Sequence, residues 1–442
     1  MNKGHLTYFN ELESYSISSL DTLLGKGSTQ ELLDLEVIKK NNNTYQFRYV
    51  GVITIKDTII GVLPKYTGYY NWDDPQKFNH FKLIIQSLII YSKSAYRKHN
   101  DEDYLSDADS VYNEAASAYW LLEDFLSNGL WNEYPTEKVL NGGNEIDWDH
   151  TINNINPIIQ NGNPYYVNYY TNEINWVSEN VITQIHEWAL YYCNNKYASI
   201  LGFPITYFYP LEKGKIGSDE YIISKIDEIL HEVFDDRKIQ LLKRIKLLIQ
   251  KKSEENSNYI SLFGTKKFDT VWEEACKEAF YDQYEEHKIH IESPIWKSTN
   301  EKVLKTSAKH IPDILHNHDN AFLVLDAKYY NVQIKDESID GHPNLGDITK
   351  QFIYAHYFNR LCKEKPIINC FLFPNIDNEF TSLKHIGYVD LPLEIFEGER
   401  IFNIYISPKE LLEMYVGSKN KRFLEQLLTI TLPLSTKKEK LK

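Results

Sequence analysis

The sequence predicts an α/β protein with a mixed α+β N-terminal region, and three observations support this class. Near the start, β-branched residues gather in two short runs that are typical of strands. The middle of the chain carries long stretches with apolar residues at helical spacing, and the C-terminal part alternates between the helical and the strand period. A composition of 42% hydrophobic and 25% charged residues indicates a folded chain, and 442 residues suffice for two or three domains.

The first expected domain, residues 1–70, is a β-rich module. Residues 45–66 predict two strands joined by a turn at Lys56 and Asp57, and Pro64 suits the end of the second strand. The second expected domain, residues 71–255, is mainly helical and suits partner binding or a scaffold. Its apolar spacing predicts helices over residues 77–96, 115–126, 181–193 and 221–252. The Gly-, Asn- and Pro-rich residues 141–164 predict a loop.

The third expected domain comprises residues 256–442. A helix is predicted over residues 268–284, followed by three strand candidates at 288–296, 310–315 and 321–330. A helix over residues 345–364 and a strand over 367–374 come next. The order helix, three strands, helix, strand is that of an α/β sandwich.

Charged side chains follow the apolar core of the third strand candidate. Residues 321–325 are all apolar, Asp326 comes directly after them, and Lys328 stands two places further on. Asp313 lies upstream, across a polar turn. Because side chains two apart in a strand point to the same side, Asp326 and Lys328 are expected to share one face.

Hairpin pairing then decides whether Asp313 joins them. If His316 pairs with Ala321 around a turn of residues 317–320, Asp313 faces Val324 and is the diagonal neighbour of Asp326. Like-charged carboxylates at that distance require a proton or a cation between them, and hard oxygen ligands suit Mg²⁺. Such an ion can polarise a phosphodiester and lower the pKa of a bound water, while an adjacent lysine orients the nucleophile or neutralises developing charge. The pattern predicts phosphodiester hydrolysis.

The letters Pro-Asp at 312–313 and Asp-Ala-Lys at 326–328 resemble the signature of the PD-(D/E)xK nuclease superfamily, and the predicted element order resembles its core. The resemblance implies that Asp313 and Asp326 hold the metal, helped by the backbone carbonyl of Ala327, with Lys328 as the catalytic lysine.

The same resemblance implies accessory residues on the two flanking helices. Glu273 matches an acidic residue on the first helix, with Glu274 as an alternative. Gln351 resembles a glutamine on the helix after the active-site strand, and Tyr354 lies close behind it as another alternative.

Within the superfamily, residues 47–66 and 142–153 together with the C-terminal motif resemble the McrC-like subunits of McrBC-type restriction systems, and most closely the LlaJI restriction endonuclease family. The resemblance implies a Mg²⁺-dependent endonuclease subunit that cleaves double-stranded DNA together with a separate, McrB-like AAA+ GTPase motor. Consistently, the chain contains no G-x-x-x-x-G-K-[ST] phosphate-binding loop, and residues 23–29 have its letters in the wrong order. Two other hypotheses stay open: a non-catalytic subunit that activates the NTPase, and a repair or CRISPR-adaptation exonuclease on the same fold.

Charge and composition exclude several other classes. A formal net charge of −14 means that DNA affinity must come from a local basic face or from a partner. No signal-peptide core and no run of eighteen apolar residues is present, so we expect a cytoplasmic protein with no membrane contact. The four cysteines are scattered without a C-x-x-C pair, which argues against a zinc site, an iron–sulfur cluster or a disulfide framework.

Overall fold

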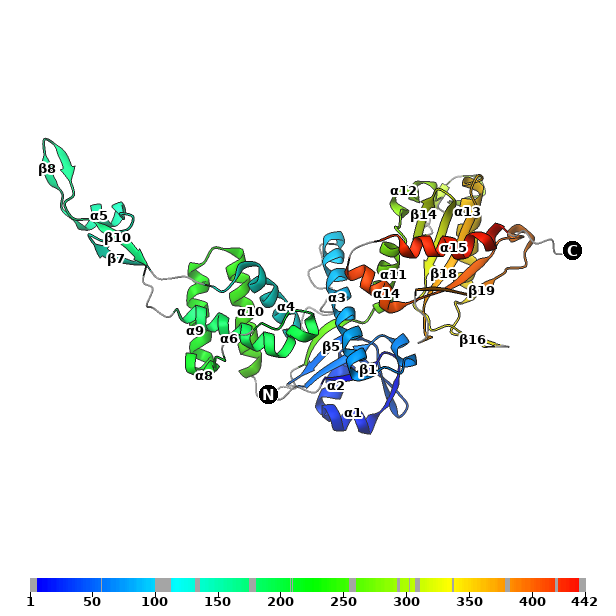
Figure 1. Cartoon of the computed structure of the whole chain (residues 1–442), viewed down its shortest axis with the longest axis horizontal. Helices are drawn as coiled ribbons and strands as arrows, with labels where there is room; N and C mark the ends of the chain where they lie inside the picture. Colours follow the sequence, from blue (N-terminus) through cyan, green and yellow to red (C-terminus); the bar gives the residue numbers. More distant parts are fainter. Residues whose placement is uncertain are drawn as a thin grey trace. The chain divides into compact units, whose positions relative to one another are not determined.

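The structure is a computed structural model of the whole chain (Figure 1). It describes residues 6–56, 58–99, 113–131, 136–174, 180–206, 208, 210–253, 260–291, 295–301, 303–306, 311–335, 338–377, 382–417 and 420–436. The chain divides into two compact units: residues 1–113, 200–202 and 258–442 form the first, and residues 114–199 and 203–257 form the second. The α/β class predicted from the sequence is confirmed.

The N-terminal part of the first unit is built on a four-stranded sheet in the order β1-β6-β5-β11. Its strands are β1 (Thr7–Asn10), β5 (Val50–Ile55), β6 (Thr58–Leu63) and β11 (Ile260–Thr265). The predicted hairpin is confirmed, because β5 and β6 pair antiparallel around Lys56, which adopts a φ of 54°. β11 pairs with β5, so a segment assigned to the predicted third domain completes the N-terminal sheet. The predicted boundary near residue 255 lies outside the described residues, and the three-domain division stays a prediction.

A smaller sheet and several helices surround this sheet. The smaller sheet has the order β2-β4-β3 and comprises β2 (Ser14–Ser16), β4 (Thr44–Phe47) and β3 (Ile38–Asn41). The neighbouring helices are α1 (Ile17–Leu24), α2 (Lys26–Asp34), η1 (Lys65–Tyr69) and α3 (Asp74–His99). Residues 23–29 span the junction of α1 and α2, which confirms that they do not form a phosphate-binding loop between a strand and a helix. The predicted helix over residues 77–96 corresponds to α3.

The C-terminal part of the first unit contains a five-stranded sheet in the order β14-β15-β18-β20-β19. Its strands are β14 (Ile314–His318), β15 (Ala321–Ala327), β18 (Ile367–Pro374), β20 (Ile401–Ile406) and β19 (Leu383–Val389). The helices around it are α11 (Phe268–Ala279), α13 (Leu345–Leu361), α14 (Pro408–Val416) and α15 (Arg422–Thr436). β15 is buried throughout, and α13 and α15 pack against the sheet (Figure 1).

The first of the three predicted strands is wrong. Residues 288–290 form a 3₁₀ helix, η3 (Lys288–His290), after the short helix α12 (Tyr284–His287). β12 (Ile295–Lys297) pairs with β13 (Val303–Thr306) in a separate two-stranded sheet. A second such sheet, of β16 (Gln333–Lys335) and β17 (Ser338–Asp340), follows β15. The central sheet instead gains β19 and β20 from the chain that follows β18.

The predicted hairpin register is also wrong, by two residues. His318, not His316, pairs with Ala321, so the turn consists of Asp319 and Asn320 and is shorter than predicted. Val324 therefore pairs with Leu315, and not with Asp313. Because side chains alternate with a period of two, a shift of two residues leaves every side chain on its predicted face.

The second unit is mainly helical. Its longer helices are α4 (Glu114–Asn128), α6 (Val181–Cys193), α9 (Asp219–Glu232) and α10 (Asp236–Ser253). The prediction of a single long helix over residues 221–252 is wrong. The helix α9 ends at Glu232, and a second helix, α10, begins at Asp236 and packs back against α9. Asp124 of α4 accepts a two-pronged hydrogen bond from Arg237 of α10, at 2.7 and 2.9 Å.

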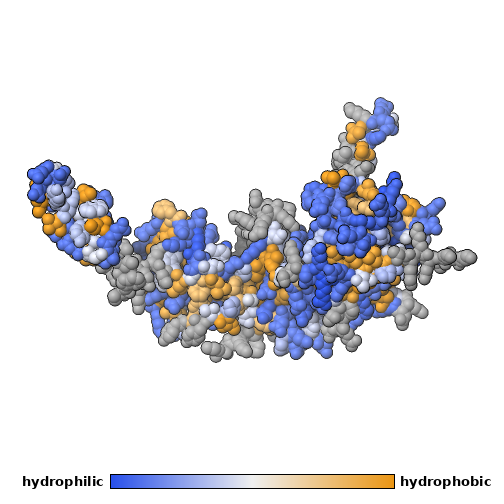
Figure 2. Space-filling model, turned by 45° about the horizontal axis from the view of Figure 1, so that its top comes forward, coloured by the Kyte–Doolittle hydropathy of each residue, from blue (hydrophilic) through white to orange (hydrophobic). Residues whose placement is uncertain are grey.

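Residues 141–164, predicted as a loop, contain regular structure. They contain the helix α5 (Trp148–Asn154) and the strand β8 (Ile158–Gln160), and β9 (Asn163–Tyr165), which pairs with β8 in a hairpin, begins within them. β7 (Thr136–Leu140) and β10 (Tyr170–Ile174) pair beside them. Figure 2 shows hydrophobic side chains on the surface of residues 136–174, and the exposed ones include Trp148, Ile158, Ile159, Tyr165 and Val167.

Two expectations about composition can be compared with the structure. Cys193, Cys276 and Cys370 are buried and Cys362 is half-buried, and all four are free thiols. Among the described residues, no helix combines the length and the apolar character needed to cross a membrane.

Candidate active site

The end of β15 brings Asp313 and Asp326 together. Ile314 pairs with Leu325, so Asp313 and Asp326 are the next residues in register beyond the last pair of the hairpin. Asp313 accepts a hydrogen bond of 2.9 Å from the backbone N–H of Ala327, and the charge of Asp326 contributes to the raised pKa of the Asp313 carboxyl group. Asp326 is only 8% exposed. Its side chain lies on the same face of β15 as Phe322 and Val324, which pack against α13.

Lys328 lies beside this carboxyl pair. Its Nζ is 2.8 Å from Asp326 Oδ2 and 3.7 Å from Asp347 Oδ1. Its backbone N–H donates to Leu372 of β18 at 2.9 Å, which holds the lysine in line with the sheet although β15 ends at Ala327. The structure therefore places two acids and one ammonium group at a single strand end.

The protonation of the three groups reflects this crowding. Burial, reinforced by the charges of Asp326 and Glu273, raises the pKa of Asp313 to about 8. Burial also raises the pKa of Asp326, although its contacts with Lys328 oppose the rise. Burial alone would lower the pKa of Lys328, but the neighbouring carboxylates outweigh it and raise that pKa. A carboxyl pair that resists full ionisation is suited to binding a cation.

The helix α11 presents one of its two adjacent glutamates to this pair. The charge of Glu273 contributes to the raised pKa of Asp313, whereas Glu274 contributes to those of Asp282 and Tyr415. Lys277, one turn after Glu273, forms an ion pair with it at 2.5 Å. Of the two alternatives left open by the sequence, these charge contributions favour Glu273 as the residue nearer to Asp313.

The helix α13 contributes Tyr354 and Gln351 differently. Gln351 is buried, and its Nε2 donates to the carbonyl of Val324 at 3.0 Å and to Asn369 Oδ1 at 2.7 Å, so the amide joins α13 to β15 and β18. Burial raises the pKa of Tyr354, and the charges of Asp326 and Asp313 raise it further, which places the Tyr354 hydroxyl near the carboxyl pair. The described hydrogen bonds therefore give Gln351 a packing role, and its catalytic role stays a prediction.

Two residues near the site were missed from the sequence. Lys277 carried a usable signal, because residues four apart share one face of a helix and Glu273 was already a candidate. Asp347 lies in the first turn of α13, where the side chain of Asn344 caps its backbone N–H at 3.0 Å. An acid in the first helical turn is common for electrostatic reasons alone, so its approach to Lys328 is a tertiary contact that no local pattern indicates.

The donor set fits a hard cation that keeps part of its water shell. In the described part of the chain, no group of three or more His, Cys, Asp or Glu side chains could hold a metal ion. Asp313 and Asp326 supply two carboxylates, and Mg²⁺ commonly takes only one or two carboxylates and completes its shell with water and phosphate oxygens. The residues present are therefore compatible with Mg²⁺, and they do not form the closed cage of a structural zinc site.

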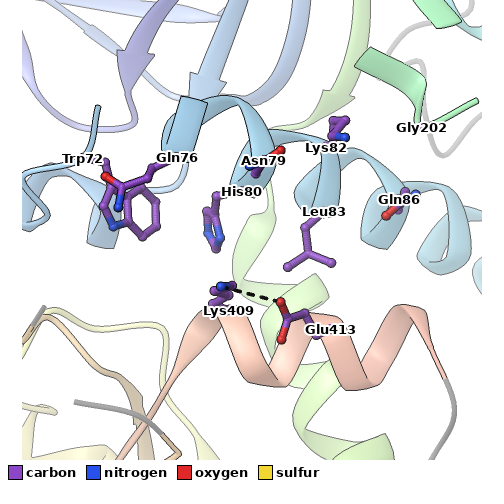
Figure 3. A pocket seen from close by; sticks show the side chains of 10 residues that line it. All are labelled: Trp72, Gln76, Asn79, His80, Lys82, Leu83, Gln86, Gly202, Lys409 and Glu413. Carbon is purple, nitrogen blue, oxygen red and sulfur yellow. Dashed lines mark ion pairs between the residues drawn. The ribbon is translucent and has the colours of Figure 1, made fainter. Parts of the chain in front are cut away.

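A separate groove in the first unit does not share this chemistry (Figure 3). It has a volume of about 490 Å³, and His80 and Leu83 of α3 point toward Lys409 and Glu413 of α14 across it. Glu413 is paired with Lys409 at 3.9 Å. Burial lowers the pKa of His80 to about 3, so the imidazole is neutral, and it hydrogen-bonds to the Tyr66 hydroxyl at 3.0 Å. The groove lacks a carboxylate pair among its lining residues and is not the site described above.

Comparison with known proteins places these residues in a family context. The family model for the LlaJI restriction endonuclease matches residues 49–407, a range that includes every candidate site residue. The Type II restriction enzyme BsuMI component YdjA of Bacillus subtilis (strain 168) is 31% identical over 431 residues, which cover 93% of this chain and 90% of that protein.

Two solved structures from Thermococcus gammatolerans are also similar. A half-complex from a tetradecameric assembly of McrB AAA+ hexamers with bound McrC matches at a TM-score of 0.40 and 12% identity, covering 96% of this chain and 100% of that chain. A cryo-EM structure of the McrBC complex matches at a TM-score of 0.23 and 12% identity, covering 55% of this chain and 79% of that chain. The family match and the Bacillus relative, which each span most of the sequence, carry the assignment: the chain belongs to the LlaJI restriction endonuclease family.

Proposed function

We propose that this chain is the Mg²⁺-dependent DNA endonuclease subunit of a McrBC/LlaJI-type restriction system, with a PD-(D/E)xK core, hydrolysing phosphodiester bonds of double-stranded DNA. The observation that carries the proposal is the convergence of Asp313, Asp326 and Lys328 at the end of β15, with Nζ of Lys328 2.8 Å from Asp326. Membership in a restriction endonuclease family supports the same chemistry.

Each residue has a distinct part in this proposal. Asp313 and Asp326, with the carbonyl of Ala327, would hold Mg²⁺, which when bound polarises the phosphodiester and lowers the pKa of a water molecule. Lys328 places an ammonium group where the attacking water is oriented or where charge develops on the phosphate. The ion pair with Asp326 limits the motion of the long lysine side chain, so its charge is already in position before the substrate arrives.

We propose an AAA+ GTPase motor as the partner. The Bacillus relative is named as one component of an enzyme, and these 442 residues contain no phosphate-binding loop of their own. With a net charge of −14, the chain gains little long-range attraction to DNA, and a motor that holds DNA beside it would supply the missing affinity.

Metal dependence is the direct test. The full chain, combined with a McrB-like GTPase, GTP and Mg²⁺, should cleave closed circular plasmid DNA, and excess chelator should abolish cleavage because the carboxyl pair alone cannot activate water. Agarose gels of the plasmid forms measure the reaction. Cleavage that persists in chelator would exclude the metal mechanism, and cleavage of linear DNA only would indicate an exonuclease. GTPase stimulation without any cleavage would instead identify a non-catalytic activator.

A matched pair of variants tests the two adjacent glutamates. Glu273→Gln should lower the cleavage rate by about tenfold or more, since it removes a charge that acts on Asp313 and the partner of Lys277. Glu274→Gln changes the same charge one residue away and should stay within about twofold of the unaltered chain. Initial rates on plasmid DNA decide between them, and a larger loss in Glu274→Gln would reverse the assignment.

A further inference from the structure

The residue after Lys328 connects the candidate nuclease site to the N-terminal sheet. The Tyr329 hydroxyl donates to Glu11 Oε2 at 2.7 Å, although the two residues are 318 positions apart in the sequence. The backbone N–H of Lys65 lies 3.2 Å from the same Glu11 oxygen and 3.1 Å from the Tyr329 hydroxyl. Glu11 directly follows β1 and Lys65 begins η1, so both partners belong to the N-terminal part of the unit.

Ring packing closes the environment of Tyr329 from two sides. Lys65 Nζ lies 4.2 Å from the centre of the Tyr329 ring, which is a cation–π distance. Phe268 and Trp272 of α11 contact the same ring, at 5.5 and 6.4 Å between centroids. Tyr329 is 5% exposed, so its hydroxyl depends on protein partners rather than on water.

The charges around this contact show that it is costly to maintain. Burial raises the pKa of Glu11, opposed by its hydrogen bond from Tyr329 and the charge of Lys65, and burial lowers the pKa of Lys65. A carboxylate that is desolvated in this way becomes strongly destabilising once its donors are removed. The N-terminal sheet therefore holds the chain at Tyr329 through a contact that tolerates little displacement.

We propose that Glu11 and Tyr329 are positioning residues for the candidate active site, with the N-terminal sheet fixing the strand end that carries Lys328. This inference rests on the proposed function. Lys328 and Tyr329 are adjacent in the chain. At this strand end, the backbone N–H of Ala327 donates to the carboxylate of Asp313, and that of Lys328 donates to the carbonyl of Leu372 in β18. A shift of Tyr329 would move the ammonium group of Lys328 relative to Asp326, and small misplacements of a catalytic group cost rate far more than binding.

The variant Tyr329→Phe keeps the ring and removes the hydroxyl. In the complex with the GTPase, we expect kcat for plasmid cleavage to fall about tenfold with KM for DNA within about twofold, because positioning acts on the transition state. Glu11→Ala should behave alike, whereas Glu11→Gln should recover most of the activity, since its amide oxygen still accepts both hydrogen bonds. The double variant should be no slower than the slower single variant, as expected for one shared contact.

Tyr70→Phe is the matched control. The Tyr70 hydroxyl also donates from the N-terminal part to the C-terminal sheet, but to the carbonyl of Asn375, just after β18 and away from Lys328. This variant loses a comparable hydrogen bond and should keep its kcat within about twofold. If Tyr329→Phe and Tyr70→Phe lower kcat equally, the contact at Tyr329 is merely structural and the proposal is overturned.

Hydrogen exchange gives a result that does not depend on cleavage. In Tyr329→Phe, the amides of Ala327 and Lys328 should exchange about tenfold faster, while those of β18 stay protected. Unchanged exchange at these two amides overturns the positioning role even if the chain is an active nuclease. Faster exchange in a chain that never cleaves DNA would uphold the link to the strand end and reject the proposed function.

Discussion

Asp326→Asn should lower DNA cleavage by at least about a thousandfold while leaving the chain folded, because a bound metal supplies several kcal/mol of transition-state stabilisation. The amide is nearly the same size as the carboxylate, so the packing of β15 against α13 is kept, but it loses the charge that pairs with Lys328. Asp313→Asn and Lys328→Ala should be equally inactive. Initial cleavage rates with the GTPase, GTP and Mg²⁺ measure the effect.

Asp340→Asn is the control for this series. Asp340 also pairs with a lysine, Lys335 at 3.0 Å, but both side chains are more than 60% exposed, at 62% and 61%. Exposed pairs contribute little to stability, so this variant should cleave DNA at the unaltered rate. Cleavage within tenfold of the unaltered chain in all three site variants would contradict the assignment of the active site.

Loss of activity in Asp313→Asn should coincide with a gain in stability when chelator is present. The pKa of Asp313 is raised from 3.8 to about 8 in the folded chain, so folding disfavours its ionised form. Below about pH 4 the carboxyl group is protonated and does not oppose folding. As the pH rises from about 4 to 8, its ionisation lowers the free energy of unfolding. The asparagine variant lacks this penalty and can still accept the N–H of Ala327, so its melting temperature should exceed that of the unaltered chain most clearly near pH 8. A lower melting temperature would mean that the inactive variant is misfolded.

The sequence predicted which side chains meet at the candidate site more accurately than it predicted the elements around that site. The hairpin register was wrong by two residues because the polar run at 316–320 does not reveal which two of its residues form the turn. The acids nevertheless stayed on one face, since only an odd shift would have separated them. The alternation of β15 is thus the feature that made Asp326 and Lys328 predictable.

Errors elsewhere arose where tertiary contacts override a local pattern. The amphipathic period continues across residues 233–235, so nothing in the spacing indicates that α9 and α10 fold back on each other. The catalytic role of Gln351 stays a prediction, and the hydrogen bond that its amide donates to the carbonyl of Val324 is a tertiary contact that the motif position does not indicate. The role of Glu11 was invisible because its partner lies 318 residues away.

Gly51→Ala should destabilise the first unit by at least about 3 kcal/mol, the sum of backbone strain and a steric clash. Gly51 pairs with Gly264 across β5 and β11 and has a φ of 142°, which side chains rarely adopt. A Cβ there would lie 2.3 Å from the carbonyl oxygen of Phe263 and 2.6 Å from the Cα of Gly264, both of which are backbone atoms that cannot rotate away.

The effect has a matched control and a structural consequence. Gly143→Ala adds the same methyl group where no atom lies within 4 Å, and should change the free energy of unfolding by less than about 0.5 kcal/mol. Urea unfolding followed by circular dichroism compares the two variants.

Because β11 immediately precedes α11 in the chain, losing the β5–β11 pairing should also loosen the helix that carries Glu273. An unchanged urea midpoint for Gly51→Ala would show that β5 and β11 can separate without cost. In that case the close approach of the two glycines would not hold the N-terminal sheet to the segment that leads into α11.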